Sequence, residues 1–167
     1  MSAKLCMVEE IKEMRASQAD TASGCARDFL GNRFVYVVIS ARARGLSIGL
    51  NLNPDKLCNY DCVYCEVNRE APPSEHELDI GVMAAELEKT LILIHSGQIR
   101  QMAGYGALNA DLLRLRHVAF SGDGEPTLCA SFAEAVQEVV HVRARRVLPF
   151  FKLVLITNGT GLDLRPI

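Results

Sequence analysis

The sequence predicts an α/β fold built on a parallel sheet, and three observations support this prediction. Segment 117–121 is typical of a short buried strand, and segment 151–156 is apolar at nearly every position, as a strand covered on both faces is. Segment 79–96 and the stretch after residue 131 repeat apolar residues every three or four positions, as amphipathic helices do. From residue 46 onward the elements alternate as strand, loop, helix, strand, loop, helix, strand and loop, which is the order of a parallel α/β sheet.

The strands before this alternation are predicted from residue type. Segments 33–40 and 46–52 are rich in β-branched, aromatic and aliphatic residues, and a basic turn separates them. Pro54 ends the second strand because proline cannot donate to a strand ladder. At the N-terminus, apolar spacing over 5–15 predicts a short helix, and the small polar residues of 16–26 indicate a loose segment that precedes a domain over 27–167.

The two helices have recognisable boundaries. The first is predicted from about residue 79 to 96, and Gly97 is a plausible stop because glycine adopts left-handed backbone angles readily. For the second helix, Ser131 and Glu134 form a capping-box pattern at its start, and Pro149 interrupts it. Each of the last three strands therefore runs directly into a loop, and these loops are expected to meet at one edge of the sheet.

Length and composition describe one globular domain. The chain has 167 residues, of which 49% are hydrophobic, and its formal net charge is −2. That charge gives no general reason to expect binding to nucleic acid or to an anionic membrane. No apolar run approaches the ~20 residues needed to cross a bilayer, and charged residues interrupt any candidate signal peptide. We therefore expect a cytoplasmic protein.

Three cysteines, Cys58, Cys62 and Cys65, form a C-x3-C-x2-C cluster. Thiolates are the soft ligands that iron–sulfur clusters require, and three of them can hold three irons of a [4Fe-4S] cubane. With no fourth cysteine nearby, one iron would keep an open position. The alternatives are a zinc site, free thiols, or a closed electron-transfer cluster with Cys25 or Cys129 as fourth ligand. The roles of the lone cysteines are left open: Cys6, Cys25 and Cys129.

Segment 58–65 (CNYDCVYC) resembles the signature of the radical S-adenosylmethionine (SAM) superfamily, including the aromatic residue before its last cysteine, Tyr64. The chain is similar to an iron–sulfur oxidoreductase subgroup related to the wybutosine-forming enzymes and the glycyl-radical-enzyme activases. The resemblance extends over 27–160 and rests on three stretches: 49–66, 121–127 and 157–160.

The resemblance implies the N-terminal half of a (β/α)6 partial barrel, with about three parallel strand–helix units present. It implies a [4Fe-4S] cluster and SAM as cofactors, and reductive cleavage of SAM to a 5′-deoxyadenosyl radical. A reductant such as flavodoxin or ferredoxin would supply the electron. The resemblance leaves the substrate open, and it allows nucleic acid as a partner only by family analogy.

The resemblance also implies residue roles. The family's glycine–glutamate motif matches 122–125, although Asp123 stands where many members have a second glycine. Glu125 would accept a hydrogen bond from the methionine ammonium of SAM. The SAM contacts that the resemblance implies are Tyr64, Gly122, Asp123, Gly124, Glu125 and Asn158. The alternatives are an ordinary strand-to-helix turn for 122–125, a plain Asn-Gly turn for Asn158, and simple packing over the cysteine segment for Tyr64.

The chain stops after about three units, so the sequence predicts a core truncated on its C-terminal side. We expect the second half of the barrel, with the ribose contacts and much of the substrate pocket, to be missing. The apolar strand 151–156 would then have an open edge, which favours association between chains. A chain in this form is expected to turn over substrate poorly.

Overall fold

The computed structural model describes residues 29–145 and 149–163, so the helix expected over 5–15 and the loose segment after it lie outside the described residues. None of the helices within these ranges is long and apolar enough to cross a lipid bilayer. The elements are, in chain order, β1 (Val35–Ser40), β2 (Gly45–Leu50), α2 (Ile80–His95), the 3-10 helix η1 (Gln98–Gln101), β3 (Leu115–Phe120), the 3-10 helix η2 (Pro126–Leu128), α3 (Phe132–Ala144) and β4 (Lys152–Leu155).

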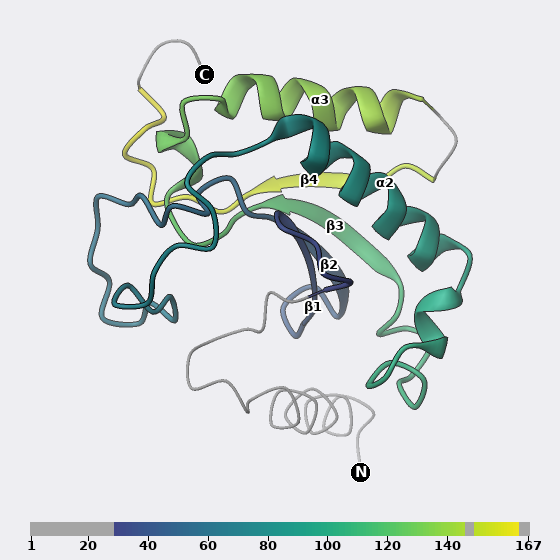
Figure 1. The fold of residues 1–167 in the computed structure, drawn as a ribbon. Helices are drawn as coiled ribbons and strands as arrows, with labels where there is room; N and C mark the ends of the chain where they lie inside the picture. Colours follow the sequence, from purple (N-terminus) through teal and green to yellow (C-terminus); the bar gives the residue numbers. More distant parts are fainter. Residues whose placement is uncertain (1–28, 146–148, 164–167) are drawn as a thin grey trace.

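The strands form one sheet in the order β1-β2-β3-β4 (Figure 1). Strands β2, β3 and β4 are parallel to one another, which confirms the predicted α/β sheet. Strand β1 is antiparallel to β2, because the four-residue turn between them is too short for a crossover connection. The result is a mostly parallel sheet with one antiparallel edge strand.

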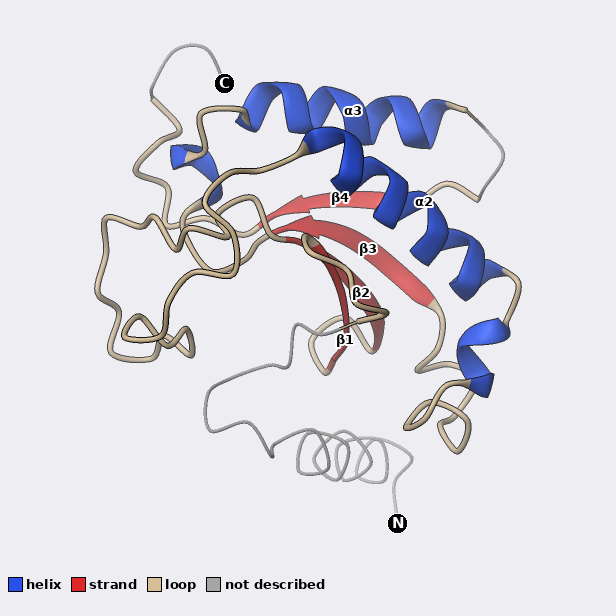
Figure 2. Cartoon of the chain, viewed as in Figure 1, coloured by secondary structure: helices blue, strands red, loops and turns tan. Residues whose placement is uncertain are grey.

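Helices α2 and α3 lie side by side on one face of the sheet (Figure 2). Helix α2 buries Met83, Leu87 and Leu91 completely, at the spacing of one helical face. The ring of Phe132 at the start of α3 packs edge-on against Phe120 of β3, with ring centroids 6.1 Å apart. This covered face fixes the positions of the strand ends and therefore of the loops that follow them.

The helices begin and end where the sequence predicts, but only one of the two predicted starts has a side-chain capping hydrogen bond. Asp79 caps α2, accepting a hydrogen bond of 3.0 Å from the backbone N–H of Val82, and Gly97 follows the helix with a φ of 76°. Helix α3 begins after Ser131 as expected. The expected capping box is wrong, however, because the Ser131 side chain makes no capping hydrogen bond. Its φ and ψ of −96° and 21° lie outside the extended region that capping residues adopt.

Candidate functional site at the carboxyl edge of the sheet

Three loops meet where the parallel strands end (Figure 1). They are the cysteine loop (residues 53–79) after β2, the glutamate loop (121–125) after β3 and the asparagine loop (156–160) after β4. The backbone N–H of Glu125 donates to the carbonyl of Leu57 over 2.8 Å. Asn158 Nδ2 donates to Asn59 Oδ1 over 2.9 Å. Hydrogen bonds between the loops thus confirm the prediction that they converge on one edge.

Asn51, at the end of β2, binds the glutamate loop through its side chain. Its Nδ2 donates to Asp123 Oδ2 over 2.7 Å, and its Oδ1 accepts from the Asp123 backbone N–H over 3.0 Å. Asn51 is only 4% exposed. A Cβ at Gly122 would lie 2.1 Å from Asn51 Oδ1, so this position requires glycine for a close approach.

Position 124 also requires glycine, because the backbone there packs closely against the cysteine loop. A Cβ there would lie 2.1 Å from the carbonyl oxygen of Leu57, the residue before the first cysteine, and 2.6 Å from Cβ of Asn53. The two glycines of the glutamate loop therefore let its backbone pack directly on the end of β2 and on the cysteine loop.

The carboxylate of Glu125 is buried, at 3% exposure, and accepts hydrogen bonds from two loops. Oε1 accepts from the backbone N–H of Thr127 over 3.1 Å, from the Thr127 hydroxyl over 2.7 Å and from the Thr157 hydroxyl. Oε2 accepts from the backbone N–H of Asn158 over 2.7 Å. Burial opposes ionisation, but these donors outweigh it and lower the pKa of Glu125 below its ordinary value.

Asn158 connects the asparagine loop to the cysteine loop as well as to Glu125. Its Nδ2 donates to Asn59 and lies 4.0 Å from the sulfur of Cys58. Asn59 in turn donates to the hydroxyl of Thr160 over 2.9 Å. The predicted site residue Asn158 is therefore placed next to the first cysteine of the motif.

The three motif cysteines are free thiols on an irregular loop, with Cys58 and Cys62 partly exposed and Cys65 exposed. Burial lowers the pKa of the Arg69 guanidinium, but its interaction with the thiols of Cys58 and Cys65 outweighs this effect and raises that pKa. Interaction with the thiol of Cys62 raises the pKa of Tyr64. Tyr64 is 82% exposed to solvent, so it does not pack over the loop.

Within residues 29–145 and 149–163, no three Cys, His, Asp or Glu side chains stand in an arrangement that could hold a metal ion. The chemistry of the donors nevertheless fits an iron–sulfur cluster, because three accessible thiols share one loop that is neither helix nor strand. Asn53 Oδ1 adds a buried oxygen without a hydrogen-bond donor at the base of this loop. The cysteine loop thus offers the ligands of the expected cluster without holding them in a ligating geometry.

The other cysteines are placed differently. Cys129 lies beyond η2, is half-buried and packs against the core, and burial raises the pKa of its thiol. This environment matches that of a small apolar side chain. Cys6 and Cys25 lie outside the described residues.

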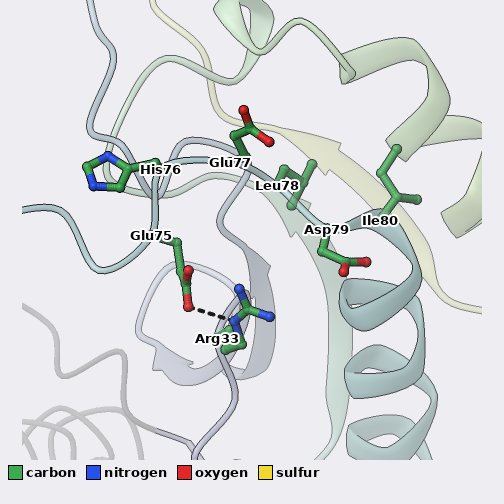
Figure 3. A pocket seen from close by; sticks show the side chains of 7 residues that line it. All are labelled: Arg33, Glu75, His76, Glu77, Leu78, Asp79 and Ile80. Carbon is green, nitrogen blue, oxygen red and sulfur yellow. Dashed lines mark hydrogen bonds and ion pairs between the residues drawn. The ribbon is translucent and has the colours of Figure 1, made fainter.

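A shallow pocket of about 650 Å³ lies beside the last part of the cysteine loop (Figure 3). Two of its three carboxylates have structural partners: Glu75 forms an ion pair of 2.6 Å with Arg33, and Asp79 caps α2. The first of these contacts joins the cysteine loop to the residues just before β1, and the second joins its end to α2. The pocket is therefore explained by how the loop is attached to the fold.

Sequence reasoning missed several residues that shape this edge, namely Asn51, Lys56, Asn59, Arg69 and Thr157. The sequence could have indicated Asn51, because it directly follows an apolar strand and therefore lies at the edge of the sheet where the other parallel strands also end. For Lys56 and Arg69 the sequence offers no spacing pattern, since their targets are carbonyls and sulfurs brought close only by the loop.

Comparison with known proteins finds relatives that match part of the chain. The chain is 28% identical over 127 residues to a UPF0026 protein of Helicobacter pylori, covering 75% of this chain and 35% of that protein. It is 30% identical over 99 residues to a UPF0026 protein of Methanocaldococcus jannaschii, covering 59% of this chain and 27% of that protein. The chain thus spans about a third of the length of the first of these relatives.

A more distant similarity, 22% identity over 134 residues, is to the GTPase Obg of Brachyspira hyodysenteriae, and it covers 16% of that protein. The present chain has no Gly-Lys pair, which a phosphate-binding P-loop requires. No family model matches the chain, and no solved structure matches it. The comparisons therefore relate the chain to proteins named UPF0026 over part of their length.

Proposed function

We propose that this chain is the core of a radical SAM enzyme, in which Cys58, Cys62 and Cys65 bind a [4Fe-4S] cluster. The observation that carries the proposal is the position of the C-x3-C-x2-C loop. It lies at the carboxyl edge of three parallel strands, hydrogen-bonded to the loops that follow the other two. In open α/β sheets this edge is where ligands bind. We further propose that the sheet is the N-terminal part of the partial barrel found in that superfamily.

The cluster and SAM together would supply the chemistry, reductive cleavage of SAM to a 5′-deoxyadenosyl radical. The chain's own residues would bind these two groups and orient them. The cysteines provide thiolates, and Gly122 and Gly124 keep the backbone of the glutamate loop free of side chains where it borders the cysteine loop. Tyr64, Asp123 and Asn158 complete the SAM-contacting set that we propose.

For Glu125 the hydrogen bonds favour a supporting role. Both of its oxygens already accept donors from Thr127, Thr157 and Asn158, so its carboxylate fixes the asparagine loop against the glutamate loop. Direct contact with the ammonium of SAM stays a prediction. If it occurs, Glu125→Ala should weaken SAM binding by roughly 10- to 150-fold, the value of one charged hydrogen bond, while iron content is retained.

The alternative is a closed electron-transfer cluster with Cys25 or Cys129 as fourth ligand. A spectroscopic test on the anaerobically reconstituted protein separates the two. The proposal expects about four irons per chain and an electron paramagnetic resonance signal of the reduced cluster that changes when SAM is added. A closed cluster would ignore SAM. A zinc site or free thiols would yield no such signal.

Cysteine-to-alanine variants test which thiols bind the cluster. Cys62→Ala should abolish iron retention, whereas Cys6→Ala and Cys129→Ala should retain it. Equal iron content in the Cys62→Ala and Cys6→Ala proteins would refute the assignment of the cluster to this motif. The electron donor in such a system would be a flavodoxin or ferredoxin, and the substrate is left unassigned.

A further inference from the structure

The cysteine loop is closed at its base by the side chain of Lys56. The ammonium Nζ donates to the carbonyl of Asn68 over 2.6 Å and to the carbonyl of Ala71 over 2.7 Å. Lys56 precedes the first cysteine, and both acceptors follow the last one. One half-buried side chain thus joins the two ends of the segment that carries all three thiols.

Arg69 makes the reciprocal connection. Its Nη1 donates to the carbonyl of Lys56 over 3.2 Å, so each of the two cations binds backbone at the other's end of the loop. The thiols of Cys58 and Cys65 raise the pKa of the same guanidinium, against the opposing effect of burial. A planar guanidinium with five donors can bind this carbonyl and still offer donors to neighbouring thiols.

The backbone around both residues is shaped for this closure. Asn68 Oδ1 accepts from the backbone N–H groups of Glu70 and Ala71 over 3.0 and 3.2 Å, a turn that accompanies the two carbonyls bound by Lys56. Lys56 itself has a φ of 64°, in the left-handed region that side-chain-bearing residues rarely adopt. Such a conformation persists only where surrounding contacts hold it.

We propose that Lys56 and Arg69 form a two-cation latch that positions the cysteine loop for cluster binding. Lys56 and Arg69 close the loop through the three backbone carbonyls that they bind, and this places the Arg69 cation on the segment that carries Cys58 and Cys65. Three thiolates on a cluster bring negative charge to the loop, which the two cations offset. Hydrogen bonds to the sulfurs of a cluster also help to set its reduction potential. The role of Arg69 towards the cluster rests on the proposed function, whereas closure of the loop does not.

Loop closure is tested on the metal-free protein by hydrogen–deuterium exchange. Lys56→Met removes the ammonium and keeps most of the side-chain length. In the Lys56→Met protein, the backbone amides between residues 56 and 71 should exchange at least about tenfold faster than in the wild type, because charged hydrogen bonds are lost. Exchange in β2 and β3 should stay unchanged. Lys89→Met is the matched control, because Lys89 is an exposed residue of α2. Equal exchange in the Lys56→Met and Lys89→Met proteins would overturn the latch.

The role of Arg69 is tested on the reconstituted protein. Arg69→Gln should lower iron affinity by about 10- to 100-fold, the usual effect of removing a group that orients metal ligands. It should also shift the midpoint potential of the remaining cluster to a lower value, and Arg69→Lys should restore part of that shift. Arg100→Gln, an exposed substitution on η1, at the far end of α2, should change neither quantity.

The outcomes separate the two proposals. A wild-type chain that binds no iron refutes the proposed function, and the exchange experiment still decides whether the latch exists. A wild-type chain that binds a cluster, together with an Arg69→Gln protein of unchanged iron affinity and potential, refutes the latch and leaves the proposed function in place.

Discussion

Asn51 and Asp123 hold each other through two reciprocal hydrogen bonds, of 2.7 and 3.0 Å, although 72 positions separate them in the sequence. One side chain stands at the end of β2 and the other in the loop after β3. Asp123 stands where the proposed family would commonly have a second glycine, and the structure gives this carboxylate a defined partner. The pair fixes the glutamate loop to the strand that leads into the cysteines.

Replacing Asn51 with Ala should lower the free energy of unfolding by about 1–3 kcal/mol, because the Asp123 backbone N–H and carboxylate lose their buried partner. Urea denaturation measures this. In a double-mutant cycle with Asp123→Ala, we expect a coupling energy of about 0.5–3 kcal/mol. Strictly additive effects would show that the two side chains do not stabilise each other.

Gly124→Ala should displace the cysteine loop, since the new Cβ would lie 2.1 Å from the carbonyl oxygen of Leu57. We expect a destabilisation of about 1–3 kcal/mol, typical of overpacking, and faster hydrogen exchange in the cysteine loop. Gly81→Ala is the control, because its Cβ would meet Asp79 only at an ordinary 3.4 Å within α2. That substitution should leave stability equal or raise it by about 0.5–1 kcal/mol. A Gly124→Ala protein as stable as Gly81→Ala would contradict the close packing of the loops.

The stability that Glu125 contributes should depend on pH in a defined direction. Its donors lower the folded-state pKa below the ordinary value of 4.5, so the contribution is present above pH 4.5 and is lost as the pH falls through the lowered pKa. Glu125→Gln replaces an acceptor with a donor and should cost about 1–3 kcal/mol at pH 7.

Urea unfolding of both proteins between pH 7 and pH 3 checks this. The difference in unfolding free energy between wild type and Glu125→Gln should be constant above pH 5 and shrink as the solution becomes more acid. A difference that stays the same down to pH 3 would mean that ionisation of Glu125 does not stabilise the fold.

The strands and helices were predictable because each is encoded by a local apolar pattern. The strand predicted over 151–156 is β4, and the helix predicted over 79–96 is α2, each with ends within one residue of the prediction. The strand predicted over 33–40 begins two residues later, at Val35. There the backbone N–H groups of Arg33 and Phe34 donate to the carboxylate of Glu86, a contact that no local pattern reveals.

At the candidate site, the sequence predicted which loops meet but not what joins them. Convergence follows from parallel strands ending at one edge, a property of the topology. The four donors to Glu125 and the two carbonyls bound by Lys56 depend on where the folded loops come to lie. Serine at position 131 shows the reverse case, because its capping pattern is present in the sequence while the backbone angles exclude the hydrogen bond.

The edge of β4 should make the chain associate with itself. Among the described residues β4 pairs only with β3, so its other edge presents unpaired backbone groups. Next to it, an apolar groove of about 380 Å³ lies between α3 and β4, lined by Val136, Leu153 and Leu155 among others. Ile156, just beyond the strand, is 57% exposed. Exposed apolar surface beside an open strand edge favours pairing between chains.

Val154→Lys should reduce this association, because a lysine on an edge strand must lose its hydration if a second strand pairs there. The sedimentation coefficient of the unmodified chain should rise with protein concentration, and that of Val154→Lys should rise much less. Ile92→Lys is the matched control, since Ile92 is an exposed apolar residue of α2, away from the edge. A concentration-independent monomer, or equal suppression by Ile92→Lys, would show that β4 does not mediate association.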